Sequence, residues 1–191
     1  TGTEDLWGLA GITVDPARIR LFDRVTGATR RASDRPVLFT HEGFSGPGPM
    51  NLAGLLGEGE SGWLSIDLCP DLGFDAIDRA VVDAGKSRRK NVFALLPSRL
   101  PERLRRALVA RAEISQETTA ATLSREARRR LVNMVKGLEV EVLGTLGYDR
   151  AEVTVGGVAL DQVDPKTMAV GRVPGLYVCG EVLDVDGPIG G

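Results

Sequence analysis

The chain has 191 residues, of which 42% are hydrophobic and 26% charged, and its formal net charge is −2, values that are ordinary for a soluble protein of one or two domains. No run approaches the roughly 18 apolar residues of a membrane span, and we find no signal peptide, so we expect a cytoplasmic protein that contacts no membrane. Two distant cysteines and one histidine exclude a disulfide scaffold and a histidine-based zinc site, and we expect no metal.

The first third of the chain has the pattern of β-strands, with β-branched residues and apolar side chains that alternate with polar ones. Glycine and proline at residues 45–49 interrupt this pattern, and Pro49 fits the first turn of a short helix over residues 49–56. The segments expected to form strands are residues 11–15, 18–23, 36–40 and 63–67, with a turn into a further strand at residues 24–29.

From about residue 71 the apolar residues recur every three or four positions, which is the spacing of the buried face of a helix. Pro101 fits the start of one such helix, and Ser124 is suited to cap the N-terminus of another, which would end at Gly137. The apolar stripes are Phe74, Ile77, Val81 and Val82; Val92, Phe93, Leu95 and Leu96; and Leu100, Leu104, Leu108 and Val109.

Charge separates this helical segment from the rest of the chain. Residues 86–136 hold 14 of the 24 Lys and Arg residues but 4 of the 26 Asp and Glu residues. The remainder is therefore acidic, although the whole chain is close to neutral. Such an asymmetry indicates that the two segments belong to different structural units.

Strand character returns after the helices, at residues 138–143, which alternate strictly, and at residues 151–155. We therefore predict an α+β fold in which a small β-barrel is interrupted by a helical insert. The expected units are a first barrel part at residues 1–67, a helical insert subdomain at 68–136, barrel return strands at 137–157 and a third unit at 158–191.

The last seventeen residues are the most informative for function. The apolar run at residues 176–179 predicts a buried strand that stops at Gly180, and Glu181 follows at once. At the carboxyl end of a parallel strand, glycine lets the backbone approach a nucleotide cofactor, and a carboxylate accepts hydrogen bonds from sugar or ribityl hydroxyls. A strand that merely ends in a glycine turn is the alternative interpretation.

Other glycines support the prediction of a cofactor site. Gly156 and Gly157 end the second return strand, and Gly190 and Gly191 supply backbone freedom where a helix N-terminus could meet a phosphate or the polar edge of a flavin. The chain ends where that helix would begin, and its first residue is Thr1 rather than Met. We therefore expect a piece of a larger nucleotide-dependent enzyme.

Motifs along most of the chain resemble those of one family. They are T-H-x-G-x-S-G-P from Thr40, L-L-P-x-R-L from Leu95, T-x-G-G-V from Thr154, P-G-L-Y-x-x-G-E from Pro174 and G-E-V-L-D-x-D-G from Gly180. The C-terminal motifs are similar to those of FAD-dependent oxidoreductases in general. Together, in this order, the motifs are most similar to the BaiN-like (YhiN-type) flavoproteins, which are NAD(P)/FAD-dependent oxidoreductases.

The resemblance implies a Rossmann-like FAD-binding domain that is split by an insertion, the insertion being the barrel with its helical subdomain. Residues 158–191 would be a C-terminal fragment of that FAD-binding domain, and its N-terminal segment would be a partner missing from this chain. The residues that would bind FAD non-covalently are, by position, Gly156, Gly157, Gly180, Glu181, Gly190 and Gly191. No catalytic residue is assigned.

Several polar residues in these motifs allow two interpretations. His41 could donate a proton to a substrate or orient its loop against the flavin, but we favour a structural histidine bonded to a backbone carbonyl. Cys179 could be a redox thiol, but we favour a small buried side chain that closes an apolar strand. Asp184 and Asp186, which the family shares, could serve the site or cap a loop.

We therefore predict a fragment of an FAD-dependent oxidoreductase that reduces a small organic substrate with electrons from NAD(P)H. The flavin would carry the chemistry, and the insert would cover it and shape the substrate pocket. The isolated chain should be inactive, because half of its cofactor site would be missing.

A non-catalytic nucleic-acid-binding module is the alternative, because residues 86–136 are basic and a small β-barrel would be compatible with that role. Those basic stretches carry little aromatic interleaving beyond Phe93, and no RNA-binding motif is present. A solvated helix face is our preferred explanation of the charge, so we expect no nucleic-acid partner.

Overall fold

Strands and helices follow one another along the chain in a mixed α+β fold, which is the class predicted from the sequence. The computed structural model describes residues 4–23, 25–57, 59–84 and 90–189. None of the helices among those residues is long and apolar enough to cross a lipid bilayer.

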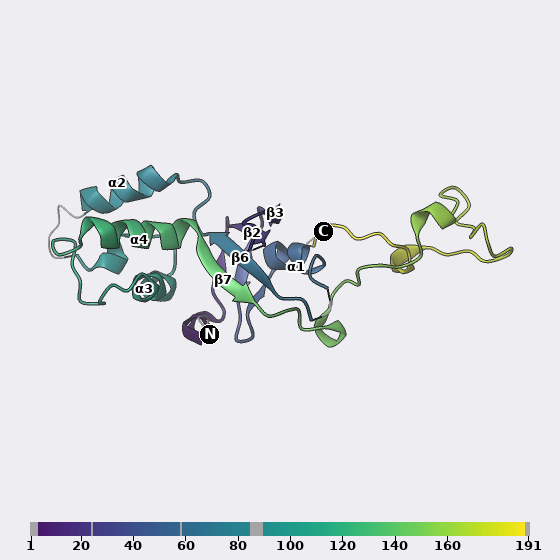
Figure 1. Cartoon of the computed structure of the whole chain (residues 1–191), viewed down its shortest axis with the longest axis horizontal. Helices are drawn as coiled ribbons and strands as arrows, with labels where there is room; N and C mark the ends of the chain where they lie inside the picture. The colour runs from purple at the N-terminus through teal and green to yellow at the C-terminus, as the bar shows by residue number, and fades with distance from the viewer. Residues whose placement is uncertain (1–3, 24, 58, 85–89, 190–191) are drawn as a thin grey trace.

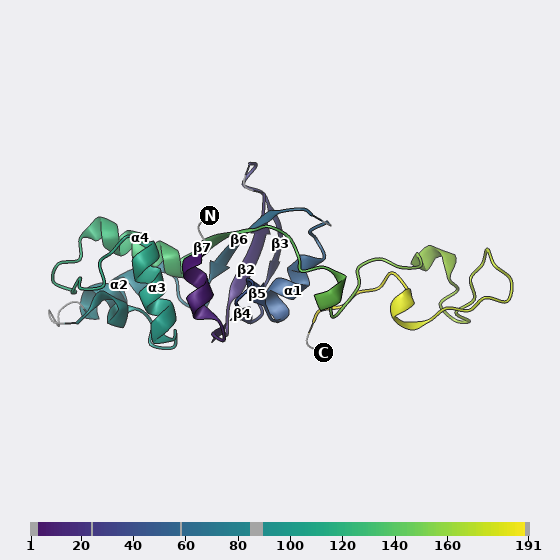
Figure 2. The ribbon, with the colours of Figure 1, turned by 90° about the horizontal axis from the view of Figure 1, so that it is seen from below.

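The molecule is elongated (Figures 1 and 2). Helices α2 (Phe74–Ala84), α3 (Glu102–Arg111) and α4 (Arg125–Lys136) form one end, which we call the helical unit. Strands lie in the middle. Residues 151–189, which we call the arm, extend from the other end and turn back toward α1 (Pro47–Ala53).

The middle of the molecule contains a four-stranded antiparallel sheet of β2 (Arg18–Phe22), β3 (Thr29–Ser33), β6 (Gly62–Asp67) and β7 (Leu138–Val142). The strands neighbour one another in the order β3-β2-β6-β7. In β2 and β7 every second side chain is buried, as expected where one face of a sheet covers the core. β2, β6 and β7 begin and end within one residue of the positions that the alternation predicts, and β3 begins where the turn expected at residues 24–29 ends.

β6 and β7 pair along their length although the helical unit lies between them in the chain. Ile66 pairs with Leu138 and is fully buried, whereas Trp63 pairs with Glu141. Because side chains alternate along a strand, Trp63 and Glu141 share the face opposite to that of Leu64. The predicted helical insertion between two strands of one sheet is therefore confirmed.

A second antiparallel sheet contains β1 (Thr13–Val14), β4 (Val37–Phe39) and β5 (Phe44–Ser45) in the order β1-β4-β5. The two sheets do not close into one ladder within the described residues. α1 packs against β2 so closely that a Cβ on Gly48 would lie 2.5 Å from Ile19 Cδ1. The helix begins two residues before the predicted start.

The helical unit has its own apolar interior, to which α3 contributes Leu104, Leu108 and Val109. The side chain of Ser124 accepts a hydrogen bond from the backbone N–H of Ala127 at 3.1 Å, which confirms the predicted cap of α4. The stripe at Val92–Leu95 forms a short 3-10 helix rather than an α-helix. Further 3-10 helices occur at Glu4–Leu9, Tyr148–Arg150, Leu160–Gln162 and Gly180–Val182.

The strands predicted at residues 151–155 and 176–179 are wrong. Within the arm, the described residues form only isolated bridges, such as Ala169 with Tyr177, and no continuous ladder. Val155 is 55% exposed and Tyr177 is 65% exposed. A strand requires a neighbouring backbone that pairs with it over several residues. Residues 168–170 exchange two backbone hydrogen bonds with residues 176–178, but this pairing is limited to a single bridge, and no described bridge involves residues 151–155.

Candidate functional site

The two glycine-bearing segments that were predicted to bind a cofactor lie side by side in the arm. Val158 pairs with Leu183 in a parallel bridge. The N–H of Val158 donates to the Val182 carbonyl at 2.8 Å, and the N–H of Asp184 donates to the Val158 carbonyl at 3.0 Å. The structure thus joins the predicted site residues near 156 to those near 181.

Glycine is required where these segments cross. A Cβ on Gly157 would lie 2.6 Å from the Val182 carbonyl oxygen, a contact that real Cβ atoms do not make. Any side chain at residue 157 would therefore separate the two segments. Gly156 has a φ of 97°, in the left-handed region that favours glycine.

Gly180 and Glu181 face open space beside this crossing. Gly180 has a φ of 79° and begins the 3-10 helix, and a Cβ built on it would meet no atom within 4 Å. Glu181 is exposed. A ligand could therefore approach the Gly180 backbone and the Glu181 carboxylate together, which is the arrangement that a ribose or ribityl chain requires.

Two residues outside the arm hold its returning end. The N–H of Ile189 donates to Asn51 Oδ1 at 2.7 Å, and Arg35 donates from a terminal guanidinium nitrogen to the Ile189 carbonyl at 3.0 Å. Asn51 belongs to α1, so the backbone of Ile189 is fixed against the body of the molecule. Gly190 and Gly191, the last two predicted cofactor residues, lie outside the described residues.

This two-point clamp was missed from the sequence. Asn51 and Arg35 precede Ile189 by 138 and 154 residues, and they bind its backbone rather than a complementary side chain. No local pattern indicates a contact of that kind. The clamp becomes visible only when the arm is seen to return to α1.

Four polar residues of the family motifs can be compared with the environments expected for them. His41 is exposed in the turn between β4 and β5, and the favoured bond from its side chain to a backbone carbonyl stays a prediction. Cys179 is exposed rather than buried, because the strand it was to close does not form. Asp184 and Asp186 are both exposed.

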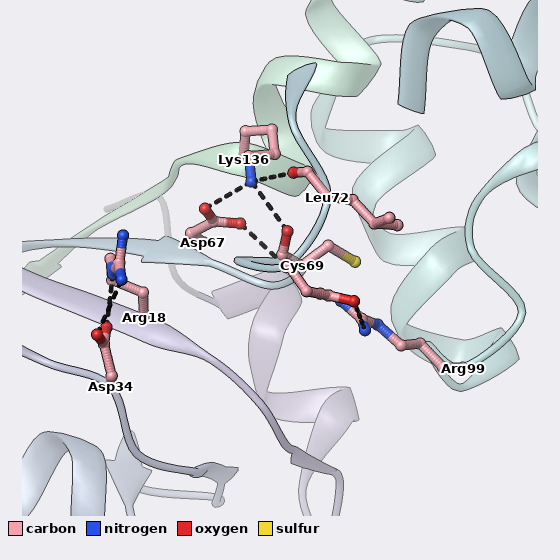
Figure 3. A network of polar contacts seen from close by, with 8 residues as sticks. Arg18, Asp34, Asp67, Cys69, Leu72, Arg99 and Lys136 are labelled. Atoms are coloured by element: carbon pink, nitrogen blue, oxygen red, sulfur yellow. Dashed lines mark hydrogen bonds and ion pairs between the residues drawn. The ribbon is translucent and has the colours of Figure 1, made fainter. Parts of the chain in front are cut away.

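A polar network joins the sheet to the helical unit (Figure 3). The Nζ of Lys136, at the end of α4, lies 2.7 Å from the Asp67 carboxylate and donates to the carbonyls of Cys69 and Leu72 at 2.9 and 2.5 Å. Asp67 also accepts from the N–H of Cys69 at 3.0 Å. The Lys136 and Asp67 side chains are 19% and 8% exposed, so this is a largely desolvated ion pair.

Cys69 is a structural residue of that network. Burial raises the pKa of its thiol, which disfavours the thiolate that a nucleophile would need. Nearby, Arg99 forms a bidentate ion pair with Asp71, and the hydrogen bonds from Arg99 lower the pKa of the Asp71 carboxyl group.

Several arginines of the basic segment have structural partners. Arg128 binds Asp78 of α2 through two hydrogen bonds of 2.7 and 3.3 Å, and Arg130 donates to the Ala112 carbonyl at 3.1 Å. Arg106 lies 3.8 Å from the centre of the Phe93 ring, a cation–π contact. The predicted solvated face is therefore only part of the explanation for the charge.

Comparison with known proteins gives these features a context. Residues 3–153 match the family model of the HI0933-like protein barrel and H2TH domain. The chain is 33% identical over 98% of its length to the ribosomal RNA dihydrouridine synthase of Escherichia coli, and 35% identical over 87% to that of Haemophilus influenzae. It is 28% identical over 70% to the 3-dehydro-bile acid delta(4,6)-reductase of Clostridium scindens.

The chain spans 44% and 40% of the length of the two synthases and 33% of the reductase. The function predicted from the sequence, reduction of a small organic substrate by an FAD-dependent fragment, is wrong, because the relatives that cover most of the chain are named for a reaction on ribosomal RNA. The alternative was a non-catalytic nucleic-acid-binding module, whereas both of these relatives are named as enzymes.

Proposed function

This chain belongs to the family of HI0933-like proteins, as its resemblance to the BaiN-like flavoproteins indicated, and on that premise we propose that it acts in an RNA-modifying enzyme, a ribosomal RNA dihydrouridine synthase. The observation that supports the proposal most is the 33% identity to the Escherichia coli enzyme over 98% of the chain. That similarity extends through the sheets, the helical unit and the arm.

The name of the reaction defines its chemistry. Conversion of uridine to dihydrouridine adds two electrons and two protons across the C5–C6 double bond of uracil. A bound flavin supplies such electrons as a hydride. We propose FAD as that flavin, bound non-covalently, and NAD(P)H as the source of its electrons, because the motifs resemble those of the BaiN-like flavoproteins and one relative is named as a reductase.

The arm offers residues that fit one part of FAD. Gly180 leaves its backbone open to a ligand, and Glu181 presents an exposed carboxylate that could accept hydrogen bonds from ribityl hydroxyls. Gly156 and Gly157 belong to the neighbouring segment, and Gly157 lies directly against residues 182–184. We propose that these four residues, with Gly190 and Gly191, form one wall of the cofactor site.

The clamp on Ile189 supports this assignment. By binding both the N–H and the carbonyl of Ile189, Asn51 and Arg35 fix the backbone immediately before Gly190. In the proposal, the clamp holds the returning end of the arm beside α1. The remaining cofactor contacts would come from an N-terminal FAD-binding segment of the longer protein.

The experiment is a direct assay of the product. The full-length protein is purified, supplied with FAD and NADPH, and incubated with ribosomal RNA that lacks dihydrouridine, after which the nucleosides are analysed by mass spectrometry. We expect a nucleoside two hydrogen atoms heavier than uridine, at one or a few positions. If the RNA stays unmodified while the protein is folded and binds FAD, the proposal is wrong.

A further inference from the structure

A hollow of about 830 Å³ lies where the sheet meets the helical unit. It opens on the outer face of β6 and β7, opposite the core, with the ends of α3 and α4 beside it. The side chains that define it are those of Trp63, Arg111, Asn133, Met134, Lys136 and Glu139. None of the residues that line it belongs to the arm, which contains the described cofactor residues of the prediction.

The position of Trp63 is unusual for a tryptophan. Its register with Glu141 places it on the solvent side of β6, where the alternation calls for a polar residue. It is half-buried and lines the hollow. A tryptophan on an open concave surface can stack against a nucleobase, and stacking on an aromatic side chain is a common mode of single-stranded RNA binding.

One guanidinium group lines the hollow and a second belongs to the adjoining part of α4. Arg111 lines the hollow and donates a long hydrogen bond of 3.4 Å to the Glu139 carbonyl, so its side chain extends from α3 to β7. Arg130 of α4 donates to the carbonyl of Ala112, the residue after Arg111, so its side chain reaches the end of α3. Lys136 also lines the hollow, and its ammonium group is paired with Asp67.

Asn133 completes a set of groups suited to a nucleotide. It is exposed on α4, one helical turn from Arg130, and its amide can both donate to and accept from the edge of a base. The surrounding segment, residues 86–136, has ten more basic than acidic residues and would attract a polyanion.

We propose that this hollow binds one unpaired nucleotide of the RNA substrate, with its base against Trp63 and its phosphate at Arg111 and Arg130. The inference rests on the proposed RNA-modifying function. Because no arm residue lines the hollow, the nucleotide it binds in this proposal is not the uridine that is reduced. It anchors the RNA at a distance from the reaction.

The test measures RNA binding by the full-length protein, with fluorescence anisotropy of a labelled single-stranded oligouridylate. Trp63→Ala and Arg111→Ala should each weaken binding about tenfold, the loss expected for one stacked base or one phosphate contact. Trp63→Phe should retain most of the affinity. Arg111→Ala should also reduce the slope of log affinity against log salt by about one.

Arg31→Ala is the matched control, because Arg31 is exposed on β3, the far edge strand, and its loss removes the same charge. If Arg111→Ala and Arg31→Ala weaken binding equally, or if Trp63→Ala binds like the wild type, the hollow is not the site. If the unmodified protein makes dihydrouridine and Trp63→Ala and Arg111→Ala do so at the same KM for RNA, only this inference fails. If the wild-type protein neither binds nor modifies RNA, the proposed function fails first.

Discussion

Backbone groups, rather than side chains, are the targets of the most consequential polar residues in this molecule. Asn51 and Arg35 hold the backbone of Ile189, and Lys136 donates to two carbonyls besides its ion pair. Such contacts fix one chain segment against another without requiring a particular side chain at the target. They could not be predicted from the sequence, because nothing at residue 189 indicates a partner at residue 51.

Removal of the Asn51 side chain should release the end of the arm. In Asn51→Ala the N–H of Ile189 loses its acceptor, worth about 1 kcal/mol, and its amide hydrogen should exchange about fivefold faster. Asn51→Asp keeps an acceptor oxygen and should exchange like the wild type. Hydrogen exchange followed by NMR measures both, and an unchanged rate in Asn51→Ala would contradict the role of the clamp.

Secondary-structure elements could be predicted from the sequence where the pattern of buried and exposed residues is local. Alternation predicted β2, β6 and β7, and the cap at Ser124 predicted the start of α4. β5, with two residues, is too short to show a period. The wrong strands in the arm have a different cause: an apolar run such as 176–179 predicts burial but does not identify what will cover it.

The candidate sites were harder to predict than the elements. The sequence indicated the glycines of the arm, since glycine pairs after apolar runs are visible locally. The hollow was not indicated, because Trp63, Arg111 and Asn133 come together only when β7 returns to pair with β6. Before that pairing is known, Trp63 is simply one apolar residue of a strand.

The junction between the sheet and the helical unit should depend on Lys136. Lys136→Met leaves the largely buried Asp67 carboxylate without a countercharge, which should lower the free energy of unfolding by about 3 kcal/mol. In the double variant Asp67→Asn, Lys136→Met, the charge is gone, and the Asn oxygen can still accept from the Cys69 N–H. Part of the stability should therefore return in urea unfolding, and equal losses in the two variants would exclude a role for the charge.

At the scale of the whole molecule, apolar exposure is concentrated after β7. The large hydrophobic side chains of residues 143–185 that remain exposed include Leu143, Leu146, Tyr148, Val155, Leu160, Val173, Tyr177, Val182 and Val185. By contrast, one continuous core connects the sheets to the helical unit. Stability is therefore expected to differ between the arm and the rest.

Limited proteolysis should reveal this difference. In a chain of these 191 residues, cleavage should begin within the arm and leave a resistant product that ends shortly after β7. Fragment masses would locate the cuts. First cuts within the helical unit or the four-stranded sheet would contradict the expected order of stability.

Acid should destabilise the folded body. Hydrogen bonds from Arg18 lower the pKa of Asp34, and those from Arg99 lower the pKa of Asp71. A carboxyl group whose pKa is lower in the folded state stabilises the fold above its unfolded pKa of about 4, and this contribution is lost as the pH falls through the folded value. The urea concentration at the midpoint of unfolding should therefore decrease when the pH is lowered below about 4. In Asp34→Asn this decrease should be less steep, because one of the two carboxyl groups is absent.

During synthesis, β2, β3 and β6 leave the ribosome before the helical unit, and β7 follows it. One edge of β6 therefore stays unpaired until β7 is synthesised, while the helices form quickly through local contacts. The helical unit enters the chain after Asp67 and leaves it at Lys136, and these two residues meet in an ion pair. The folded helical unit therefore has the role that a turn has in a β-hairpin. It brings its two ends together, so that β7 can pair in register with the free edge of β6.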